Sequence, residues 1–205
     1  MTHQIIIALF MLLAFNPNND HKEALNAEVW LIKPESSLVV YGKTNVNSFT
    51  CLVPSFGQTD TLSYLKTNKN ASLDIDCVMA IDLHRFNCKN KMMTKDLLKT
   101  LQANCHPHMI INFLNLSDQL SSITNNKLIV TSTEIELAGK KRKMMINLYG
   151  SECNGTTKQL KGKAQICFSD FGLEAPTKMA GTIKVKNQLD VEFTLHLERL
   201  HMQKI

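Results

Sequence analysis

The sequence is poor in aromatic residues and lacks the short motifs that accompany several common catalytic chemistries. Aromatic side chains make up 6% of its 205 residues, and they do not alternate with the basic residues as nucleic-acid-binding surfaces require. It contains no Gly-x-Ser-x-Gly, no Gly-rich phosphate loop and no Cys-x-x-Cys pair. These absences argue against nucleic-acid binding, esterase-type and kinase chemistry, and zinc-ribbon or thioredoxin sites. We therefore predict that the protein is not an enzyme.

Long hydrophobic runs are also absent, apart from one near the N-terminus. The apolar run from Ile5 to Phe15 is eleven residues long, whereas a bilayer-spanning helix needs about 20. It is too short to span a membrane but has the length of a signal-peptide core, although no Lys or Arg precedes it. We expect residues 1–20 to be a signal peptide, with cleavage no later than residue 27, and a periplasmic or secreted protein. Residues 28–205 then form one domain.

Charge and composition are those of a folded globular protein. Hydrophobic residues make up 44% of the chain and charged residues 20%, and the formal net charge is +5. The lysines are scattered, and the one basic run, Lys140-Lys141-Arg142-Lys143, follows Ala138-Gly139. This pattern favours a solvated hairpin tip, with weak attraction to an anionic membrane surface as the alternative.

Alternation of apolar and polar residues dominates the chain and predicts β-strands. It is clearest from Leu73 to Leu83 and from Ile183 to Leu197, where apolar side chains occupy every second position over most of the length. One segment differs, since Met92 to Asn104 has helical spacing, with Thr94 as the expected cap and Pro107 as the stop. Further strands are expected at 37–42, 109–116, 127–137, 142–149 and 159–169.

Seven or eight antiparallel strands with one short helix predict an all-β fold. A closed barrel and a sandwich both avoid exposed strand edges, and the alternation alone does not separate them. An eight-stranded barrel has an interior that can hold one small ligand if its lining side chains are modest in size. The prediction that we carry forward is an antiparallel eight-stranded lipocalin-like barrel.

Several of these segments together resemble the YceI-like family, whose members are exported lipocalin-like barrels that carry isoprenoids or other lipids. The resemblance covers most of the mature chain and implies a carrier of a hydrophobic or amphipathic ligand, with no catalytic residue. The alternative is a filled barrel that acts through its surface as an interaction or stress-response module. The segments that carry the resemblance are Trp30 to Tyr41, Phe86-Asn87-Cys88, Lys91 to Leu98 with Leu101 and His106-Pro107, Ile166 to Pro176, and Gly181 to Val185.

A further segment is similar to a variant subgroup of that family. It reads Gly42-Lys43-Thr44-Asn45-Val46-Asn47-Ser48-Phe49-Thr50-Cys51, in which a glycine-initiated turn and a cysteine replace the histidine and serine common in other members. Cys51 and Cys88 both stand in a Phe-x-Cys sequence, and we predict that they form a disulfide, which an oxidising compartment permits. Two buried free thiols are the alternative.

The candidate ligand-binding residues are the apolar faces of the strands and of the helix. The same side chains would be ordinary core if the barrel were filled, and the sequence does not separate lining from filling. No other cofactor is expected. The candidates are Leu73, Ile75, Met79, Ile81, Met93, Leu97, Phe113, Ile146, Phe168, Val191 and Phe193.

Two groups of polar residues are alternative candidate sites. Cys105, His106 and His108 offer a thiolate and two imidazoles to a metal, but no second ligand pair accompanies them, so we predict no metal site. Glu134 and Glu136 share one face of a strand, where solvent exposure explains them better than acid-base catalysis.

Overall fold

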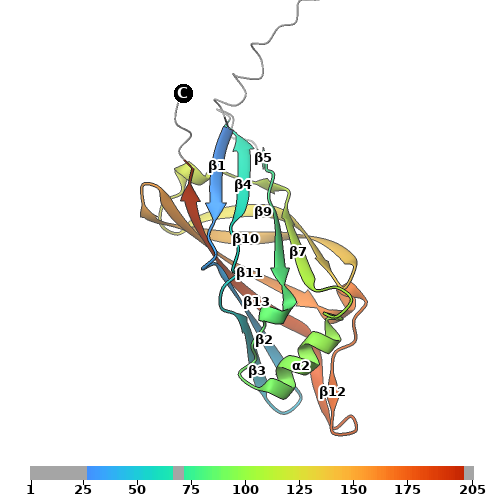
Figure 1. Cartoon of the computed structure of the whole chain (residues 1–205). Helices are drawn as coiled ribbons and strands as arrows, with labels where there is room; N and C mark the ends of the chain where they lie inside the picture. Colours follow the sequence, from blue (N-terminus) through green and yellow to red (C-terminus); the bar gives the residue numbers. More distant parts are fainter. Residues whose placement is uncertain (1–26, 67–71, 201–205) are drawn as a thin grey trace, which may run out of the picture.

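A computed structural model describes residues 27–66 and 72–200. These residues form thirteen strands, one α-helix and three 3₁₀ helices (Figure 1). The helices are η1 (Leu83–Arg85), α2 (Lys91–Thr100), η2 (Leu120–Ser122) and η3 (Phe168–Phe171). The strands are β1 (Ala27–Ile32), β2 (Ser37–Thr44), β3 (Ser48–Val53), β4 (Asp60–Leu65), β5 (Leu73–Asp74), β6 (Val78–Asp82), β7 (His108–Phe113), β8 (Asn115–Leu116), β9 (Lys127–Leu137), β10 (Lys140–Asn154), β11 (Thr157–Cys167), β12 (Thr177–Lys178) and β13 (Ile183–Arg199).

The strands build one strongly curled antiparallel sheet. Its main path has the order β3-β2-β13-β11-β10-β9-β7-β6, which is eight strands. The long strand β13 has two partners on the same edge: β2 pairs with its first part and β1 with its last residues, and β4 extends the sheet beyond β1. Pro34, which has no backbone N–H, lies in the break between β1 and β2. The sheet is therefore eight strands wide along its main path, with one edge divided between two strand pairs.

Two isolated backbone bridges join the edges of the curled sheet. Leu52 on β3 exchanges two N–H···O bonds with Asn87, at 2.9 and 2.8 Å. Ser63 on β4 exchanges two with Asp76, at 3.0 and 2.9 Å. Each bridge pairs the edges of the sheet at one point only and so shortens the rows of free N–H and C=O groups that make edge strands prone to association.

The predicted fold class is confirmed, but the number of strands differs. The sheet is antiparallel and all-β, with a single α-helix in the part of the chain that the structure describes. The expectation of one strand from Leu73 to Leu83 is wrong, because β5 pairs with β8 in a separate two-stranded sheet and β6 pairs with β7. Alternation continues through this change of partner, so the pattern did not reveal it.

Helix α2 covers one end of the sheet and differs in its limits from the predicted helix. Its N-cap is Asn90, whose Oδ1 accepts the Met93 N–H at 3.0 Å, so the expected cap at Thr94 is wrong. The helix ends long before Pro107, at a Schellman turn in which Gln102 takes a φ of 55°. Glycine is the usual residue at that position, and because Gln102 stands there instead, the helix end was predicted too late, at Asn104 before Pro107.

The β9–β10 hairpin has its turn at Ala138-Gly139, as the sequence predicted. Ala138 and Gly139 both have positive φ, at 49° and 71°, as a two-residue type I′ turn requires. Lys140 is therefore the first residue of β10, and the basic run lies along the strand beside the turn. Lys141 Nζ lies 3.2 Å from Glu134 and 3.7 Å from Glu136, so these carboxylates form surface ion pairs.

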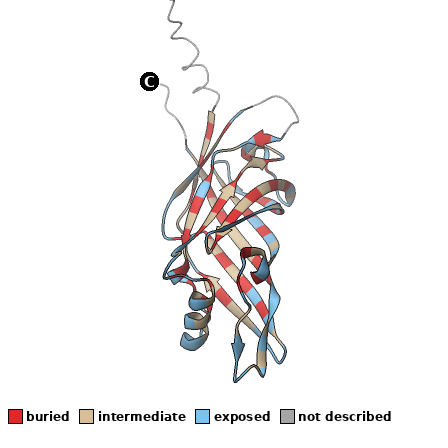
Figure 2. Cartoon of the chain, turned by 90° about the vertical axis from the view of Figure 1, so that its right-hand side faces the viewer, coloured by how far each residue is buried: buried red, intermediate tan, exposed pale blue. Residues whose placement is uncertain are grey.

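Burial follows the alternation of the strands, whereas on α2 Leu97 alone is buried (Figure 2). In the described residues, no helix has both the length and the apolar character needed to cross a bilayer. The expected signal peptide, residues 1–20, lies outside the described residues.

Candidate ligand-binding cavity

The inward-facing side chains enclose a cavity between the α2 end and the middle of the sheet. All 23 residues that line it are apolar or cysteine. The free space between the lining atoms, including part of the open mouth, is about 920 Å³. The centre of a water-sized sphere reaches about 70 Å³ of this space. The first volume is larger because it also counts open solvent at the mouth and the space within one sphere radius of the walls.

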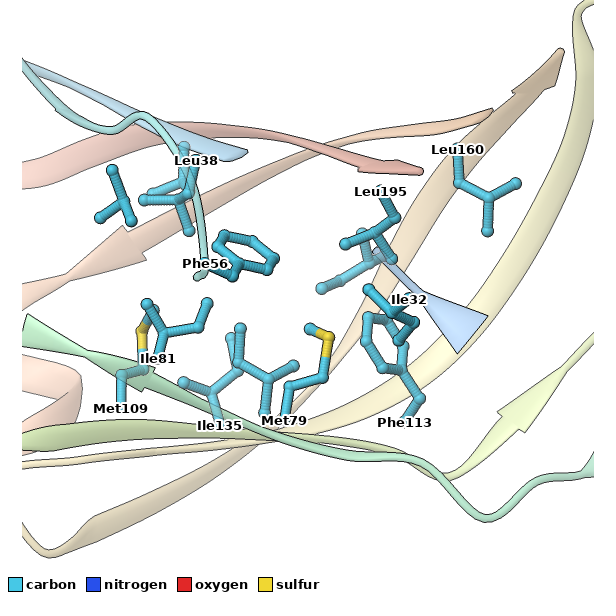
Figure 3. Close-up of a cluster of buried hydrophobic side chains, with 14 of the residues drawn as sticks. Ile32, Leu38, Phe56, Met79, Ile81, Met109, Phe113, Ile135, Leu160 and Leu195 are labelled. Carbon is cyan, nitrogen blue, oxygen red and sulfur yellow. The ribbon is translucent and has the colours of Figure 1, made fainter. Parts of the chain in front are cut away.

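The lining comes from both sides of the curled sheet. In Figure 3, Met79, Ile135 and Phe113 point from one side of the interior, and Leu38, Phe56 and Leu195 from the other. The two groups belong to strands or loops that are far apart in the sequence. Curling of the sheet therefore creates the apolar chamber.

One end of the cavity is bounded by α2 and η3. Leu97 is the buried residue of α2, and Leu101 follows it one turn later. Phe168 and Phe171, the buried residues of η3, line the same part of the cavity. The Asp170 carboxylate holds η3 by accepting the Cys167 N–H at 3.0 Å. The two short helices and the C-cap of α2 together place four large apolar side chains at the end of the chamber.

The wall formed by β11 and β13 contains small or incompletely buried residues. Ala164, Ile166 and Phe193 face inward by alternation and line the cavity, yet each is only partly buried. Gly162 lies opposite Phe193 in the ladder, and a Cβ on Gly162 would lie 2.1 Å from Phe193 Cζ. The ring of Phe193 therefore lies flat against Gly162.

The opposite end of the molecule is filled by buried polar contacts. Trp30 Nε1 donates to the Glu28 carboxylate at 3.1 Å, and Arg199 Nε lies 3.4 Å from it. The Tyr64 hydroxyl accepts a backbone N–H of η2 at 2.8 Å, and burial, reinforced by the charge of Glu28, raises the Tyr64 pKa. This end is packed, so the cavity is confined to the other part of the barrel.

Seven of the predicted ligand-binding residues line the cavity and four do not. Leu73 is buried in the small β5–β8 sheet opposite Leu116, and Ile75 lies just after it. Ile81 is buried on β6 but lies outside the lining, and Met93 packs on the core from the first turn of α2. Alternation identifies an inward face but not its position along the barrel, which explains why these four residues lie away from the cavity. The seven are Met79, Leu97, Phe113, Ile146, Phe168, Val191 and Phe193.

The sequence pattern did not identify several other residues that line the cavity. Phe56 lies in the loop after β3, where no alternation marks it as inward-facing. Phe86 follows η1 and Leu101 follows α2, so both also lie outside a strand or helix. Ala164 is part of an alternating strand but is too small to stand out as a lining residue. For Phe56 and Phe86, the only available sequence signal was an aromatic residue next to a turn.

The six cysteines have different surroundings. Cys51 and Cys88, the pair named from the sequence, form a disulfide beside the Leu52–Asn87 bridge. Cys77 is buried, and this burial, with nearby Asp60 and Asp76, raises its pKa to about 12. Cys105 and Cys153 are exposed and Cys167 lines the cavity.

The polar groupings do not assemble into a second site. Asp82 Oδ1 lies 3.1 Å from His84 Nδ1, and the backbone of Asp82 pairs with that of His108. Cys105 and His108 are exposed and His106 is half-buried. Among residues 27–66 and 72–200, no group of three or more His, Cys, Asp or Glu side chains is arranged to hold a metal.

Comparison with solved structures gives the fold. No protein-family model matches the sequence, and no curated protein does. A polyisoprenoid-binding domain from Saccharophagus degradans, implicated in plant cell wall breakdown, aligns with a TM-score of 0.60 at 13% identity, over 84% of this chain and 98% of that one. BcnA from Burkholderia cenocepacia aligns with a TM-score of 0.58 at 16% identity, over 80% and 98%.

A Campylobacter jejuni YCEI protein also aligns, with a TM-score of 0.47 at 13% identity, over 69% of this chain and 82% of that one. At this score the alignment adds no argument of its own. The two better alignments cover nearly the whole of the matched chains. The chain therefore has the lipocalin-like fold that its resemblance to the YceI-like family implied.

Proposed function

We propose that this protein is an exported carrier that holds a hydrophobic or amphipathic molecule, an isoprenoid or another lipid, inside the barrel. The observation that carries the proposal is the cavity, whose lining consists of apolar residues and one cysteine. Removing apolar ligand surface from water contributes about 25 cal/mol per Å², so a long hydrocarbon chain binds without any specific polar contact. No catalytic residue is needed, and none is proposed.

The small volume of the cavity favours a thin ligand. The space open to the centre of a water-sized sphere is about 70 Å³, well below the roughly 300–1,000 Å³ of small-molecule sites. A slender chain can occupy such a space, whereas a wide ring system would displace the lining side chains. The printed name of the Saccharophagus protein, a polyisoprenoid-binding domain, supports the same class of ligand.

Export is part of the proposal. The disulfide between Cys51 and Cys88 is of the kind that persists in oxidising compartments. The apolar run from Ile5 to Phe15 has the length of a signal-peptide core. Both support a periplasmic or secreted protein.

The second candidate is a filled barrel that acts through its surface. The observation that favours the filled barrel is the small volume of the cavity, about 70 Å³. In that case the partly buried Ala164 and Ile166 are simply a loosely packed region of the core.

Native mass spectrometry of the protein purified from its own host distinguishes the two candidates. We expect one molecule of an apolar compound per chain, which organic extraction releases for identification. A clean apo mass, together with no uptake of added geranylgeraniol, a short isoprenoid alcohol, would overturn the carrier proposal in favour of the filled barrel.

A further inference from the structure

Three exposed apolar side chains lie at the α2 end of the molecule. Met179, Met92 and Val46 are 73%, 70% and 65% exposed, which places them among the four most exposed large hydrophobic residues in the described chain. They come from the β12–β13 turn, the first turn of α2 and the β2–β3 turn. Figures 1 and 2 show these elements at the same end, away from the C-terminus.

Specific contacts hold the three elements together. Asn45, in the β2–β3 turn, donates from Nδ2 to the Thr182 carbonyl at 2.9 Å. Its Oδ1 accepts the Lys184 N–H at 2.9 Å, and its own N–H donates to the Lys184 carbonyl at 3.0 Å. Lys178 of β12 and Asp96 of α2 form an ion pair at 2.5 Å. The three apolar residues are therefore parts of one connected surface.

The same surface carries the excess positive charge of the protein. Residues 43–48, 89–99 and 170–186 contain eight lysines against three acidic residues, a formal excess of +5. This equals the net charge of the whole chain, so the remaining sequence is balanced. One of the three acidic residues, Asp96, is already paired with Lys178, and another, Asp170, accepts a hydrogen bond within η3.

From this combination we propose that the α2 end is a docking surface for an anionic lipid bilayer. Single exposed hydrophobic residues are common on proteins, but here three lie on linked elements whose sequence segments are rich in lysine. Apolar side chains that enter the acyl boundary and lysines that meet anionic headgroups are the two contributions that hold peripheral proteins at membranes. The charge of an acidic protein partner would complement the lysines, but such a partner would not explain the exposed methionines.

The cavity lies toward the same end of the molecule, the α2 end, which would face the bilayer. Leu97 of α2 and Phe171 of η3 close the cavity at the docking end, whereas the other end is packed around Glu28. If the proposed carrier function holds, the docked protein presents the α2 end of its cavity to the lipid. Docking itself does not depend on the cargo, and the two are measured separately.

Vesicle sedimentation tests the proposal with the folded mature protein. We expect binding to vesicles of phosphatidylglycerol and phosphatidylcholine, weak binding to phosphatidylcholine alone, and loss of binding as salt is raised. The apolar variant combines Val46→Ser, Met92→Ser and Met179→Ser. The matched control combines Val78→Ser, Leu128→Ser and Met145→Ser, which are exposed residues on other strands. We expect the apolar variant, and not the control, to lower the partition coefficient at least about tenfold.

A second pair of variants tests the charge. Lys43→Gln, Lys184→Gln and Lys186→Gln together should lower binding to anionic vesicles at least about tenfold. The control changes three exposed lysines outside these segments, Lys66, Lys161 and Lys163, to Gln and should alter the binding little. Circular dichroism confirms that each variant is folded. No binding of the parent protein to anionic vesicles, or a larger loss in either control than in its matched variant, would overturn the proposal, whatever the result of the ligand-uptake measurement.

Discussion

Cys51 and Cys88 form a disulfide one residue away from the Leu52–Asn87 bridge, so a covalent bond and two backbone hydrogen bonds join the edges of the sheet at the same point. The disulfide closes a loop with a sequence separation of 37 residues. The disulfide and the bridge therefore hold β3 against the segment that follows η1.

Removing the disulfide should lower stability considerably. For a loop of this length the chain-entropy model gives about 4 kcal/mol of stabilisation. We expect the double variant Cys51→Ala, Cys88→Ala to lose about 3 to 4 kcal/mol of unfolding free energy, measured by urea denaturation. Adding a reductant to the parent protein should reproduce most of this loss, and a reductant should leave the double variant unchanged. Equal midpoints for oxidised and reduced parent protein would contradict the role of the disulfide.

Alkylation should distinguish the cysteines by exposure and charge state. Burial raises the pKa of Cys77 to about 12, with Asp60 and Asp76 adding to the effect, so this thiol stays protonated and enclosed. We expect iodoacetamide to modify the exposed Cys105 and Cys153 in the native protein and to leave Cys77 unmodified, as peptide mass mapping would show. Modification of Cys51 without reductant would be evidence against the disulfide.

Gly162 should not tolerate a side chain. A Cβ at this position would lie 2.1 Å from Phe193 Cζ, so Gly162→Ala should destabilise the fold by about 1 to 3 kcal/mol. Gly155→Ala is the control, because a Cβ there meets no atom within 4 Å. In a Phe193→Ala background, Gly162→Ala should cost less, and urea denaturation of the four proteins measures this coupling. An unchanged cost in that background would contradict the packing of the ring on the glycine.

Filling the cavity should block ligand uptake without unfolding the protein. Ala164 lines the cavity from β11, so Ala164→Leu occupies free space that the cargo would otherwise use. We expect uptake of geranylgeraniol, followed by native mass spectrometry, to fall while the melting temperature stays the same or rises. Ala80→Leu provides the matched control, since Ala80 alternates with the inward-facing Met79 and Ile81 on β6 and lies outside the lining. Undiminished uptake by Ala164→Leu would place the ligand elsewhere.

Acid should remove one electrostatic contribution to stability. Burial raises the pKa of Asp118, but hydrogen bonds from Lys127, Ser122 and the Gln119 N–H outweigh it and hold the pKa below its ordinary value. A lowered folded-state pKa stabilises the protein above the unfolded value of about 4, and this contribution is lost as the pH falls through the folded value.

We therefore expect Asp118→Asn to lower the melting temperature at pH 7 and to differ little from the parent protein near pH 2. Asp74→Asn, at an exposed position on β5, is the control for the change in charge. A melting-temperature difference that persists unchanged in acid would show that Asp118 stabilises the fold by some means other than its ionised carboxylate.

The sequence by itself determined the local structure. Alternation predicted β9 at residues 127–137, with the limits that the structure shows, and Ala138-Gly139 marked its turn. Helical spacing located α2 to within a few residues. These features depend on near neighbours in the chain, which is why the pattern of a short segment reveals them.

The tertiary structure alone decided where the cavity lies. Leu73 and Met79 have the same place in the alternation, yet one packs in the small β5–β8 sheet and the other lines the chamber. The difference arises because β6 pairs with β7 while β5 pairs with β8, a choice that depends on residues far away in the sequence. Register and curl set the height of each side chain along the barrel, and no local pattern encodes them.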